Sequence, residues 1–242
     1  MKTETAIKYE IAEKPKNGIP VIIVAAGSFT RMKGINKQLA EISGVPVIIR
    51  TLLAFENSDK ISDIILVVRA DDVFSLQLLT EKYGIKKLTD IVCGGGTRQE
   101  SVIKGLSRLS FDTERVLIHD GARPLVTGRI IENVVSGLGE YSAVTCGMPV
   151  VDTVKRVDEN GVVVNTLDRT NLVSVQTPQG VRVGDYKRAI EKAGDVSRFT
   201  DDTSIMEAAG FKVLTVEGSR SNIKITTKDD IALAESLLEE LI

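Results

Sequence analysis

The amino-acid sequence predicts an α/β fold, in which a doubly wound, mostly parallel sheet carries a protruding β-hairpin arm. Continuous apolar runs recur along the chain and are typical of parallel strands that are buried on both faces. Stretches with the period of an α-helix separate these runs, and this alternation indicates βαβ units. One segment breaks the alternation with two β-rich runs around an Asn-Gly pair, which predicts the arm.

The strands are expected where apolar runs end in small or polar residues. The first run, VIIVAA at residues 21–26, ends at Gly27, and a further strand is expected to end just before Gly94. The remaining strands are expected at residues 64–68, 116–118, 143–145 and 213–216. Helices are expected at residues 45–56, 72–83, 98–109, 129–138, 185–193, 202–209 and 228–241.

Several helix ends can be recognised from the residues that flank them. Thr97 and Glu100 have the spacing of a capping box, which predicts a helix start. The segment 227–230 places two carboxylates in a first helical turn, where the helix dipole favours negative charge. Gly84 and Gly210 each follow a helical stretch, as glycines at the C-terminal ends of helices do.

Residues 149–176 are expected to form the arm, with Asp158-Glu159-Asn160-Gly161 between its two strands. A hairpin of this length is too small to be a domain. We therefore expect it to reach over the active site or over a partner subunit. The sequence predicts a polar N-terminal extension at residues 1–18, followed by a single domain over residues 19–242 that includes the arm.

The composition excludes several classes of protein. Among 242 residues, 31 Lys and Arg stand against 33 Asp and Glu, whereas nucleic-acid binders usually show a basic surplus. No apolar run approaches the roughly 18 residues that span a bilayer, and the first residues contain no signal-peptide core. We therefore expect a cytoplasmic protein with no nucleic-acid or membrane partner. Cys93 and Cys146 lie in strand-like runs and are expected to be buried thiols.

The residues after each strand are the candidates for chemistry, because ligands of open α/β sheets bind at the carboxyl ends of the strands. After the first strand, the small residues 25–27 let backbone N–H groups approach a ligand, and Arg31, Lys33 and Lys37 follow. This combination suits a polyphosphate. Neither a P-loop nor a G-x-G-x-x-G fingerprint occurs. An ordinary solvated turn is the alternative interpretation.

Two further strand ends carry groups that suit a ligand. Glycines 94–96 lead into the capped helix and expose amides for an anion or a nucleobase edge, although a flexible connector is the alternative. Asp120 follows the fourth strand and suits a ribose or Mg²⁺. His119 is the only histidine, which excludes a multi-histidine zinc site, and we expect it to be buried and hydrogen-bonded. The two aspartates of residues 200–202 are expected to cap a helix.

Eight short motifs occur in one order along the chain, and together they are specific although each alone is weak. They are AAG-x3-RM-x4-KQ, GG-x2-R-x2-SV, HD-x-ARP, DT-x-K, a DR pair, QTPQ, TDD-x-S and NIK-x-T. In this order they resemble the 2-C-methyl-D-erythritol 4-phosphate cytidylyltransferase family. The resemblance extends from residue 21 to the C-terminus.

The resemblance implies a nucleotidyltransferase of the non-mevalonate isoprenoid pathway with a Rossmann-like fold. In that reaction the phosphate of 2-C-methyl-D-erythritol 4-phosphate attacks the α-phosphorus of CTP. The products are 4-diphosphocytidyl-2-C-methyl-D-erythritol and pyrophosphate, and Mg²⁺ is the implied cofactor. Because the nucleophile is already an anion, the protein has to position two polyanions and neutralise the developing charge. The resemblance also implies a homodimer in which the arm serves the neighbouring subunit's site.

The resemblance further assigns roles to individual residues. Arg31 and Lys37 match two basic residues that stabilise the pentacoordinate phosphorus, and Arg169 and Lys224 complete the catalytic set. The CTP-binding positions match Ala25, Ala26, Gly27, Gly94, Gly95, Ser101 and Asp120. The positions that bind the polyol phosphate match Asp120, Arg123, Thr153, Arg169, Thr177, Thr200 and Lys224. Asp120 is also the expected metal ligand.

Three residues depart from the family's pattern, and they define the alternatives. Phe29 stands where Gly is usual, Asn36 replaces the usual Pro, and Gly96 stands where a polar or acidic residue is common. Phe29 adds bulk where the triphosphate would pass, so a catalytically weak nucleotide-binding homologue is one alternative. A ribitol-5-phosphate cytidylyltransferase, with the same fold and chemistry, is the other. The motifs around Thr153 and Arg169 favour methylerythritol.

Overall fold

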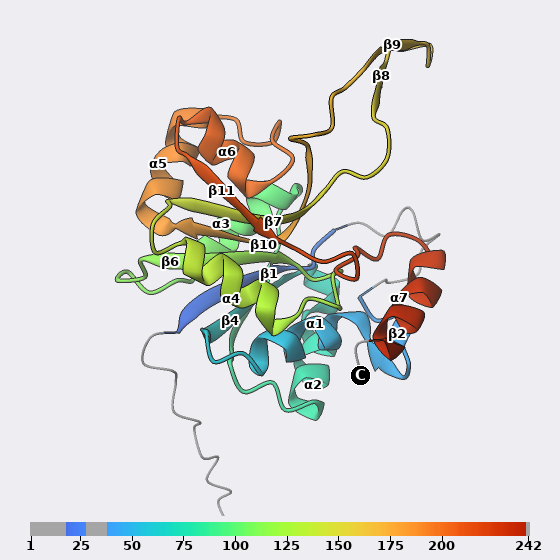
Figure 1. The fold of residues 1–242 in the computed structure, drawn as a ribbon. Coiled ribbons are helices and arrows are strands. Elements are labelled where there is room, and N and C mark those ends of the chain that lie inside the picture. Colours follow the sequence, from blue (N-terminus) through green and yellow to red (C-terminus); the bar gives the residue numbers. More distant parts are fainter. Residues whose placement is uncertain (1–17, 28–37, 241–242) are drawn as a thin grey trace, which may run out of the picture.

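A seven-stranded sheet forms the centre of the protein in the computed structural model, which describes residues 18–27 and 38–240 (Figure 1). The strands follow the spatial order β11–β7–β10–β6–β1–β4–β5. In chain order they are β1 (Ile19–Val24), β4 (Ile61–Val68), β5 (Leu88–Cys93), β6 (Arg115–Asp120), β7 (Ala143–Pro149), β10 (Val173–Arg182) and β11 (Val213–Glu217). A separate small hairpin consists of β2 (Glu41–Ile42) and β3 (Val45–Pro46).

The sheet is parallel except around β10, which pairs antiparallel with both β6 and β7. This confirms the mostly parallel sheet and every strand expected from an apolar run. The predicted arm includes the first residues of β10, but the strand continues into the sheet as far as Arg182. Because β10 contains several polar residues, it does not form an apolar run from which a strand could be predicted. Gln179, for example, is fully buried, and its burial is tolerated because its side-chain amide donates hydrogen bonds to Thr145 Oγ1 (3.1 Å) and Asp201 Oδ2 (2.7 Å).

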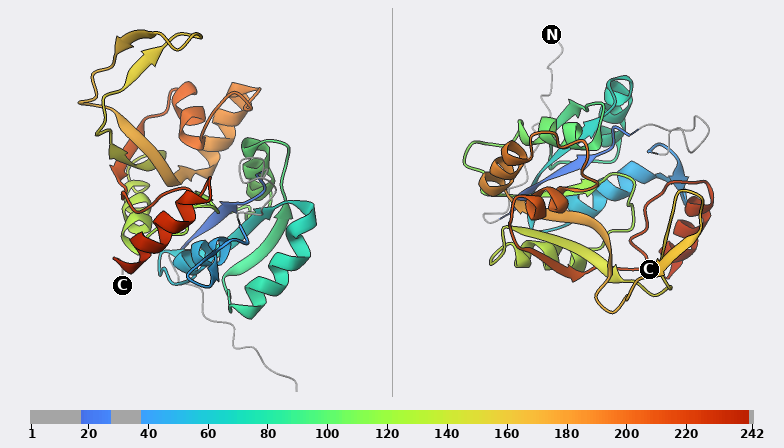
Figure 2. Two further views of the ribbon diagram at one scale, coloured as in Figure 1. Left: turned by 90° about the vertical axis from the view of Figure 1, so that its right-hand side faces the viewer. Right: turned by 90° about the horizontal axis from the view of Figure 1, so that it is seen from above.

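Helices cover both faces of the sheet, as expected of a doubly wound fold (Figure 2). Val21 and Ile23 of β1 belong to one apolar cluster and Ile22 to another, because side chains alternate between the faces of a strand. The first cluster includes residues of α1 (Val47–Glu56), α2 (Val73–Lys82) and α4 (Gly128–Gly137). The second includes residues of α3 (Arg98–Leu106), α5 (Val183–Ala193) and α6 (Asp202–Ala208).

The helix ends follow the signals in the sequence. Thr97 Oγ1 accepts the N–H of Glu100 (3.1 Å), which confirms the capping box. Gly84 and Gly210 adopt positive φ angles directly after helical segments. A short 3-10 helix, Ala70–Asp72, precedes α2. None of the helices in the described ranges has the length and hydropathy needed to cross a membrane.

The C-terminal helix α7 (Asp229–Glu239) packs beside the β2–β3 hairpin and completes a third apolar cluster. Ile225 and Ala234 lie in this cluster with Ile42 and Ala122. The N–H of Ile225 donates to the carbonyl of Ala122 (2.8 Å). The chain before α7 is therefore fastened to the segment that follows β6.

The arm projects away from the sheet (Figures 1 and 2). Its strands β8 (Lys155–Val157) and β9 (Val163–Thr166) pair antiparallel, and every residue in them is exposed. Gly161 occupies the turn with a φ of +80°, and the Asp158 carboxylate accepts the N–H groups of Asn160 and Val162 (2.9 Å each). The predicted hairpin and its Asn-Gly turn are confirmed.

The two cysteines differ in their surroundings. Cys146 is buried in β7, and burial raises its pKa to about 12. Cys93 is exposed, so the prediction that it is a buried thiol is wrong. The physical reason is its place in the sheet, because Cys93 ends β5, which is an edge strand with a neighbour on one side only.

Candidate active site

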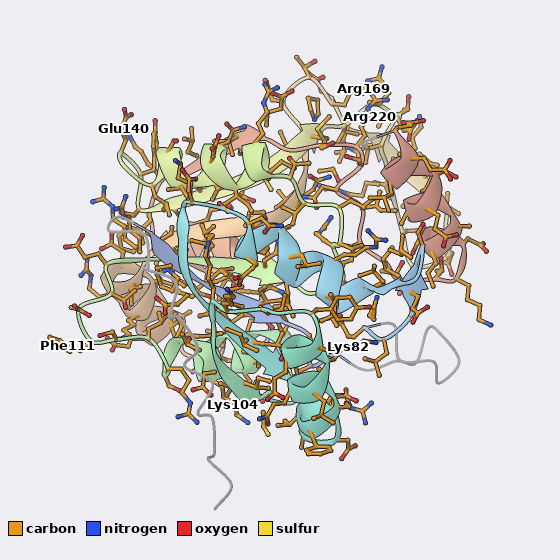
Figure 3. The ribbon with its side chains drawn as sticks, turned by 90° about the horizontal axis from the view of Figure 1, so that it is seen from below. Lys82, Lys104, Phe111, Glu140, Arg169 and Arg220 are labelled. Carbon is orange, nitrogen blue, oxygen red and sulfur yellow. The ribbon has the colours of Figure 1, made fainter. Side chains whose placement is uncertain are left out.

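A cavity of about 460 Å³ lies at the carboxyl ends of β1 and β6. Its lining comes from the two loops after β1 and β5, the end of β6 and Lys224, and consists of Val24, Ala26, Gly27, Gln38, Arg69, Gly95, Gly96, Thr97, Arg98, Ser101, Asp120, Ala122 and Lys224. Three larger cavities lie elsewhere. Two, of about 680 and 690 Å³, adjoin the loop around Phe111 at the amino end of β6, and one of about 850 Å³ lies between α2 and β5. Figure 3 shows Phe111 on the opposite side of the molecule from Arg169. Of these four cavities, which are lined by described residues, only the one of about 460 Å³ lies where α/β sheets bind ligands.

The loop between β5 and α3 is held in place by its own hydrogen bonds. Ser101 Oγ accepts the N–H of Gly95 (3.0 Å) and donates to the carbonyl of Thr97 (2.9 Å). The Glu100 carboxylate accepts the N–H of Gly96 (2.7 Å). These bonds favour a defined loop conformation over the flexible-connector interpretation. It leads directly into the N-terminus of α3, where backbone N–H groups and the helix dipole favour an anion.

The loop after β1 packs tightly against the glycine loop. A Cβ at Gly94 would clash with the Ala26 Cβ and come within 2.9 Å of Ser101 Oγ, so only glycine fits there. Ala25 is buried and its N–H donates to the carbonyl of Val67 (2.7 Å), whereas Ala26 and Gly27 line the cavity. Ala25 and Gly94 thus lie behind the lining, and the other predicted nucleotide positions of these two loops form it.

Asp120 is the centre of a cluster of charged side chains at the end of β6. Lys224 Nζ lies 2.8 Å from Asp120 Oδ2, and Arg98 Nε lies 3.1 Å from Oδ1. Arg123 Nε is more distant, at 3.7 Å from Oδ2. One carboxylate, of which about 10% is exposed, therefore collects three cations that come from separate segments of the chain.

The cations keep the Asp120 carboxylate ionised. Burial alone would raise the pKa of this group, but the charges of Arg98, Lys224 and Arg123 outweigh burial and hold the pKa well below its usual range. Burial lowers the pKa of Arg98, but the carboxylates of Asp202 and Asp120 outweigh it, so the Arg98 pKa is raised. Asp120 and Arg98 are therefore both charged at neutral pH.

His119 and Thr177 support Asp120 from inside the fold. The Thr177 hydroxyl accepts the N–H of Asp120 (3.1 Å) and lies 3.1 Å from His119 Nδ1. His119 Nε2 lies 3.2 Å from the carbonyl of Arg123, which can only accept, so Nε2 carries the proton and Nδ1 accepts from Thr177. Burial lowers the pKa of His119 to about 3. His119 is therefore a neutral, buried residue, as predicted.

Asn222 connects Arg123 to the segment that carries Lys224. Arg123 Nη1 donates to the Asn222 carbonyl (2.7 Å), and Asn222 Nδ2 donates to the Thr177 carbonyl (2.9 Å). Asn222 is fully buried. These bonds fix the backbone two residues before Lys224 and so aim its ammonium group at Asp120.

Arg98 and Asp202 belong to this cluster, although the sequence assigns neither to the site. Arg98 Nη2 donates to Asp202 Oδ2 (2.8 Å), and Asp202 Oδ1 accepts from the Tyr186 hydroxyl (2.8 Å). Asp201 caps α6 by accepting the N–H of Ser204 (2.9 Å), as predicted, but Asp202 has this additional ionic role. The sequence contained part of this information, because Arg98 is a fixed position of the GG-x2-R-x2-SV motif.

Three predicted residues do not lie at the cavity. Thr153 and Arg169 are exposed on the arm, where the Arg169 guanidinium donates to the carbonyl of Val151. Thr200 is exposed just before α6. Arg31 and Lys37, as well as Phe29 and Asn36, lie outside the described residues. The described part of the site thus unites Ala26, Gly27, Gly95, Ser101, Asp120, Arg123, Thr177 and Lys224.

The chain is similar in sequence to proteins of one family. A sequence model of the family described as 2-C-methyl-D-erythritol 4-phosphate cytidylyltransferase matches residues 19–240. The Clostridium novyi protein of that name is 44% identical over 226 residues, which are 91% of this chain and 96% of that protein. The Bacillus cereus protein of that name is 43% identical over 221 residues, which are 90% of this chain and 96% of that protein.

Solved structures show the same fold. The crystal structure of 4-diphosphocytidyl-2C-methyl-D-erythritol synthase from Anaerococcus prevotii is 33% identical, with a TM-score of 0.80 over 92% of this chain and 99% of that chain. The 2-C-methyl-D-erythritol 4-phosphate cytidylyltransferase from Francisella tularensis is 30% identical, with a TM-score of 0.75 over 91% and 99%.

Proposed function

The chain belongs to the 2-C-methyl-D-erythritol 4-phosphate cytidylyltransferase family, and we propose that its reaction takes place in the cavity beside Asp120. It is a nucleotidyltransferase of isoprenoid biosynthesis that joins CTP and 2-C-methyl-D-erythritol 4-phosphate. A phosphate oxygen of the polyol phosphate forms a bond to the α-phosphorus of CTP, and the bond from this phosphorus to pyrophosphate breaks. The attacking phosphate is already an anion, so no general base is needed.

The observation that carries this location is the charge cluster around Asp120. Two polyanions have to meet there, and their mutual repulsion opposes the reaction. Arg98, Arg123 and Lys224 bring three positive charges, whereas Asp120 and Asp202 bring two negative charges. The cluster therefore carries a net positive charge in a largely buried position, where electrostatic stabilisation is stronger than in water.

The nucleotide side of the site is assigned to the two loops that pack together. Ala25, Ala26 and Gly27 form a backbone cradle for CTP. The glycine loop, with Gly94, Gly95 and Ser101, faces the cytosine edge. Small residues suit this task because a ligand can approach the backbone closely. The tight contact between the loops, in which a Cβ at Gly94 would clash with Ala26, supports a pocket that is formed before CTP binds.

The polyol phosphate is assigned to the other side of Asp120. Lys224 and Arg123 bring positive charge to its phosphate. The buried Thr177 hydroxyl is already bonded to the N–H of Asp120 and to His119, so its part is to hold Asp120 in place. Thr200, exposed at the start of α6, is assigned to this substrate as well.

Arg31 and Lys37 are proposed to stabilise the pentacoordinate α-phosphorus. They follow the loop that bounds the cavity through Ala26 and Gly27. Their assignment rests on the motif AAG-x3-RM-x4-KQ. In the sequence, Phe29 comes between the residues of the cradle and these two cations, so we expect its size to influence the affinity for CTP.

Mg²⁺ is proposed as the cofactor, with Asp120 as its protein ligand. In the described residues no group of three or more His, Cys, Asp or Glu side chains could hold a metal ion on its own. A single ionised carboxylate at the cavity fits Mg²⁺, because this ion is usually bound by one or two carboxylates together with substrate phosphates. When bound, it would neutralise charge on the triphosphate.

A homodimer that forms through the arm is proposed because the arm has an exposed apolar surface. Five valines of the arm are exposed, namely Val151, Val157, Val162, Val163 and Val164. Exposed apolar patches of this kind mark protein–protein contacts. In such a dimer Thr153 and Arg169 would reach the partner's cavity and position its polyol phosphate.

The domain limits and the location in the cell are proposals of the same kind. Residues 19–242 are proposed to act as one domain with the arm as a part of it, after an extension at residues 1–18. The apolar clusters on the two faces of the sheet share the strands β1 and β4, which supports a single unit. The reaction uses only water-soluble substrates, which supports a cytoplasmic enzyme.

The test is an assay of pyrophosphate release by the purified protein with CTP, Mg²⁺ and either of two acceptors. We expect turnover with 2-C-methyl-D-erythritol 4-phosphate and a kcat/KM at least about 10²-fold lower with ribitol 5-phosphate, since a pocket built for one set of hydroxyl groups rejects another. Absence of pyrophosphate release with the methylerythritol substrate would overturn the assignment of the site.

A further inference from the structure

Arg98 bridges two carboxylates that come from distant parts of the chain. Its Nε lies 3.1 Å from Asp120 Oδ1 at the end of β6, and its Nη2 lies 2.8 Å from Asp202 Oδ2 at the start of α6. Asp202 is fully buried and is itself held by the Tyr186 hydroxyl (2.8 Å) and, through its N–H, by Gln179 Oε1 (3.0 Å). The Arg98 guanidinium therefore links the cavity to α6, which packs in the second apolar cluster.

The other close cation on Asp120 is attached differently. Lys224 Nζ lies 2.8 Å from Asp120 Oδ2, and 38% of its side chain is exposed, compared with 21% for Arg98. Asp120 is the only ion-pair partner of Lys224 among the described residues. Lys224 can leave Asp120 for a substrate phosphate because its ammonium group then meets another anion or water. Arg98 cannot leave without abandoning a buried carboxylate, which is strongly unfavourable.

The position of Arg98 is not explained by stability alone. Its third nitrogen, Nη1, is buried and has no hydrogen-bond partner among the residues that the structure describes. A buried donor without a partner lowers stability, so an arginine selected only to hold the fold would bond all of its nitrogens. The geometry instead satisfies the two nitrogens that point at Asp120 and Asp202. Departures of this kind from complete hydrogen bonding are expected where function constrains a residue.

We propose that Arg98 is a positioning residue, which is anchored by Asp202 and holds the Asp120 carboxylate fixed while Lys224 moves to the substrates. This inference rests on the proposed function of the Asp120 cavity. In this proposal the cations of the cluster have different roles. The anchored Arg98 sets the position of the Asp120 carboxylate, and the more exposed Lys224 takes part in binding the substrates. Asp202 then influences turnover although it does not line the cavity.

The experiment compares Arg98→Ala, Arg98→Lys and Asp202→Asn with the parent protein in the pyrophosphate-release assay. Arg98→Ala should lower kcat by about 10²-fold, as a misplaced reacting group does, and should also weaken CTP binding in calorimetry, because a cation of the cavity lining is lost. Arg98→Lys keeps the charge but cannot bridge two carboxylates, so it should recover about a tenth of the lost activity at most. Asp202→Asn, which has the same shape, should lower kcat by about tenfold.

Tyr186→Phe is the matched control. It removes a hydrogen bond from Asp202 but leaves both bonds of Arg98 in place, so we expect a lower Tm and a kcat within about threefold of the parent. Guanidinium ion added to Arg98→Ala should restore part of kcat, an effect that a merely structural role would not produce. The proposal is overturned if Asp202→Asn has the kcat of the parent, or if Tyr186→Phe loses as much kcat as Asp202→Asn.

The parent protein separates this inference from the proposed function. If the parent releases no pyrophosphate, the proposed function has failed. If the parent is active and Arg98→Lys and Asp202→Asn match it while remaining folded, the positioning role has failed. Asp202→Asn preserves the size of the side chain, so its kcat decides the test even if Arg98→Ala does not fold.

Discussion

The cavity around Asp120 and the arm are assigned to the same active site, yet they are built in opposite ways. Around the cavity, Asp120, His119 and Thr177 are buried and bonded to one another. Along the arm, every residue of β8 and β9 is exposed, and the Arg169 guanidinium donates to a backbone carbonyl of the arm itself. The contrast teaches that one half of the site is preorganised within a single chain. In the proposed dimer, a second copy would complete the other half.

The largest effect is expected from Asp120→Asn. Without the carboxylate, Arg98, Arg123 and Lys224 lose their common partner, and the proposed metal ligand is also lost. We expect kcat/KM in the pyrophosphate-release assay to fall by about 10³-fold. Asp112→Asn is the matched control, since Asp112 is an exposed carboxylate beside the cavity at the other end of the strands, and it should leave kcat/KM unchanged. A loss below about tenfold for Asp120→Asn would contradict the preorganised half of the account.

The next effect concerns the arm. Arg169→Ala should lower kcat/KM by about 10²-fold, because a charged group that orients the polyol phosphate is removed. The Tm should not change, since the side chain is exposed. Arg156→Ala, another exposed arginine on the arm, should behave like the parent. Equal activity losses for both arginines would mean that the arm acts through its total charge and not through Arg169.

Gly94→Ala tests whether the cavity is formed before ligands bind. The added Cβ would clash with Ala26, so we expect the free energy of unfolding to fall by about 1–3 kcal/mol, together with weaker CTP binding. A Cβ at Gly27 would meet no atom of the described residues within 4 Å, so Gly27→Ala should have little effect on stability. Denaturant unfolding and CTP calorimetry on both variants provide the comparison. Similar free energies of unfolding for the two variants would show that the two loops can move apart at little energetic cost.

The smallest effect is a dependence of stability on pH that comes from His119. Burial lowers its pKa to about 3 in the folded protein, whereas in the unfolded chain it is about 6.5. Between these values the unfolded state binds a proton that the folded state does not, so stability falls as the pH is lowered. The slope should be about 1 kcal/mol per pH unit between pH 6 and 5.

His119→Asn should flatten that slope, because asparagine can also donate and accept a hydrogen bond but does not titrate. The lowered pKa of Asp120 affects stability only below about pH 4, where the unfolded carboxyl groups become protonated, so it does not interfere in this range. Urea unfolding at three pH values measures the slope. A parent protein with constant stability from pH 7 to 5 would contradict the buried, neutral state of His119.

The same contrast explains how much could be predicted from the sequence. Apolar periodicity predicted the parallel strands, the helices and their caps, because these features depend on neighbouring residues. The Asn-Gly turn at residues 160–161 predicted the arm for the same reason. The position of Asp120 at a strand end placed it in the cavity without further information.

What the sequence did not predict depends on contacts between distant segments. β10 contains Gln179 at a fully buried position, which makes sense only once its partners Thr145 and Asp201 are known. The ion pair of Arg98 with Asp202 joins residues that are 104 positions apart, and no local pattern indicates it. Cys93 lies in an apolar run like that of Cys146, but only the order of the strands shows that it is at an edge.

The most direct test of the account is to mix Arg169→Ala and Asp120→Asn subunits. Neither variant alone should be active, because one lacks the arm residue and the other lacks the cavity residue. If the arm serves the neighbouring subunit, a hybrid dimer has one site with an intact cavity and an intact arm. Random pairing of refolded subunits should then restore about a quarter of the parent's activity. If the mixture stays as inactive as the separate variants, the arm does not complete a partner's site.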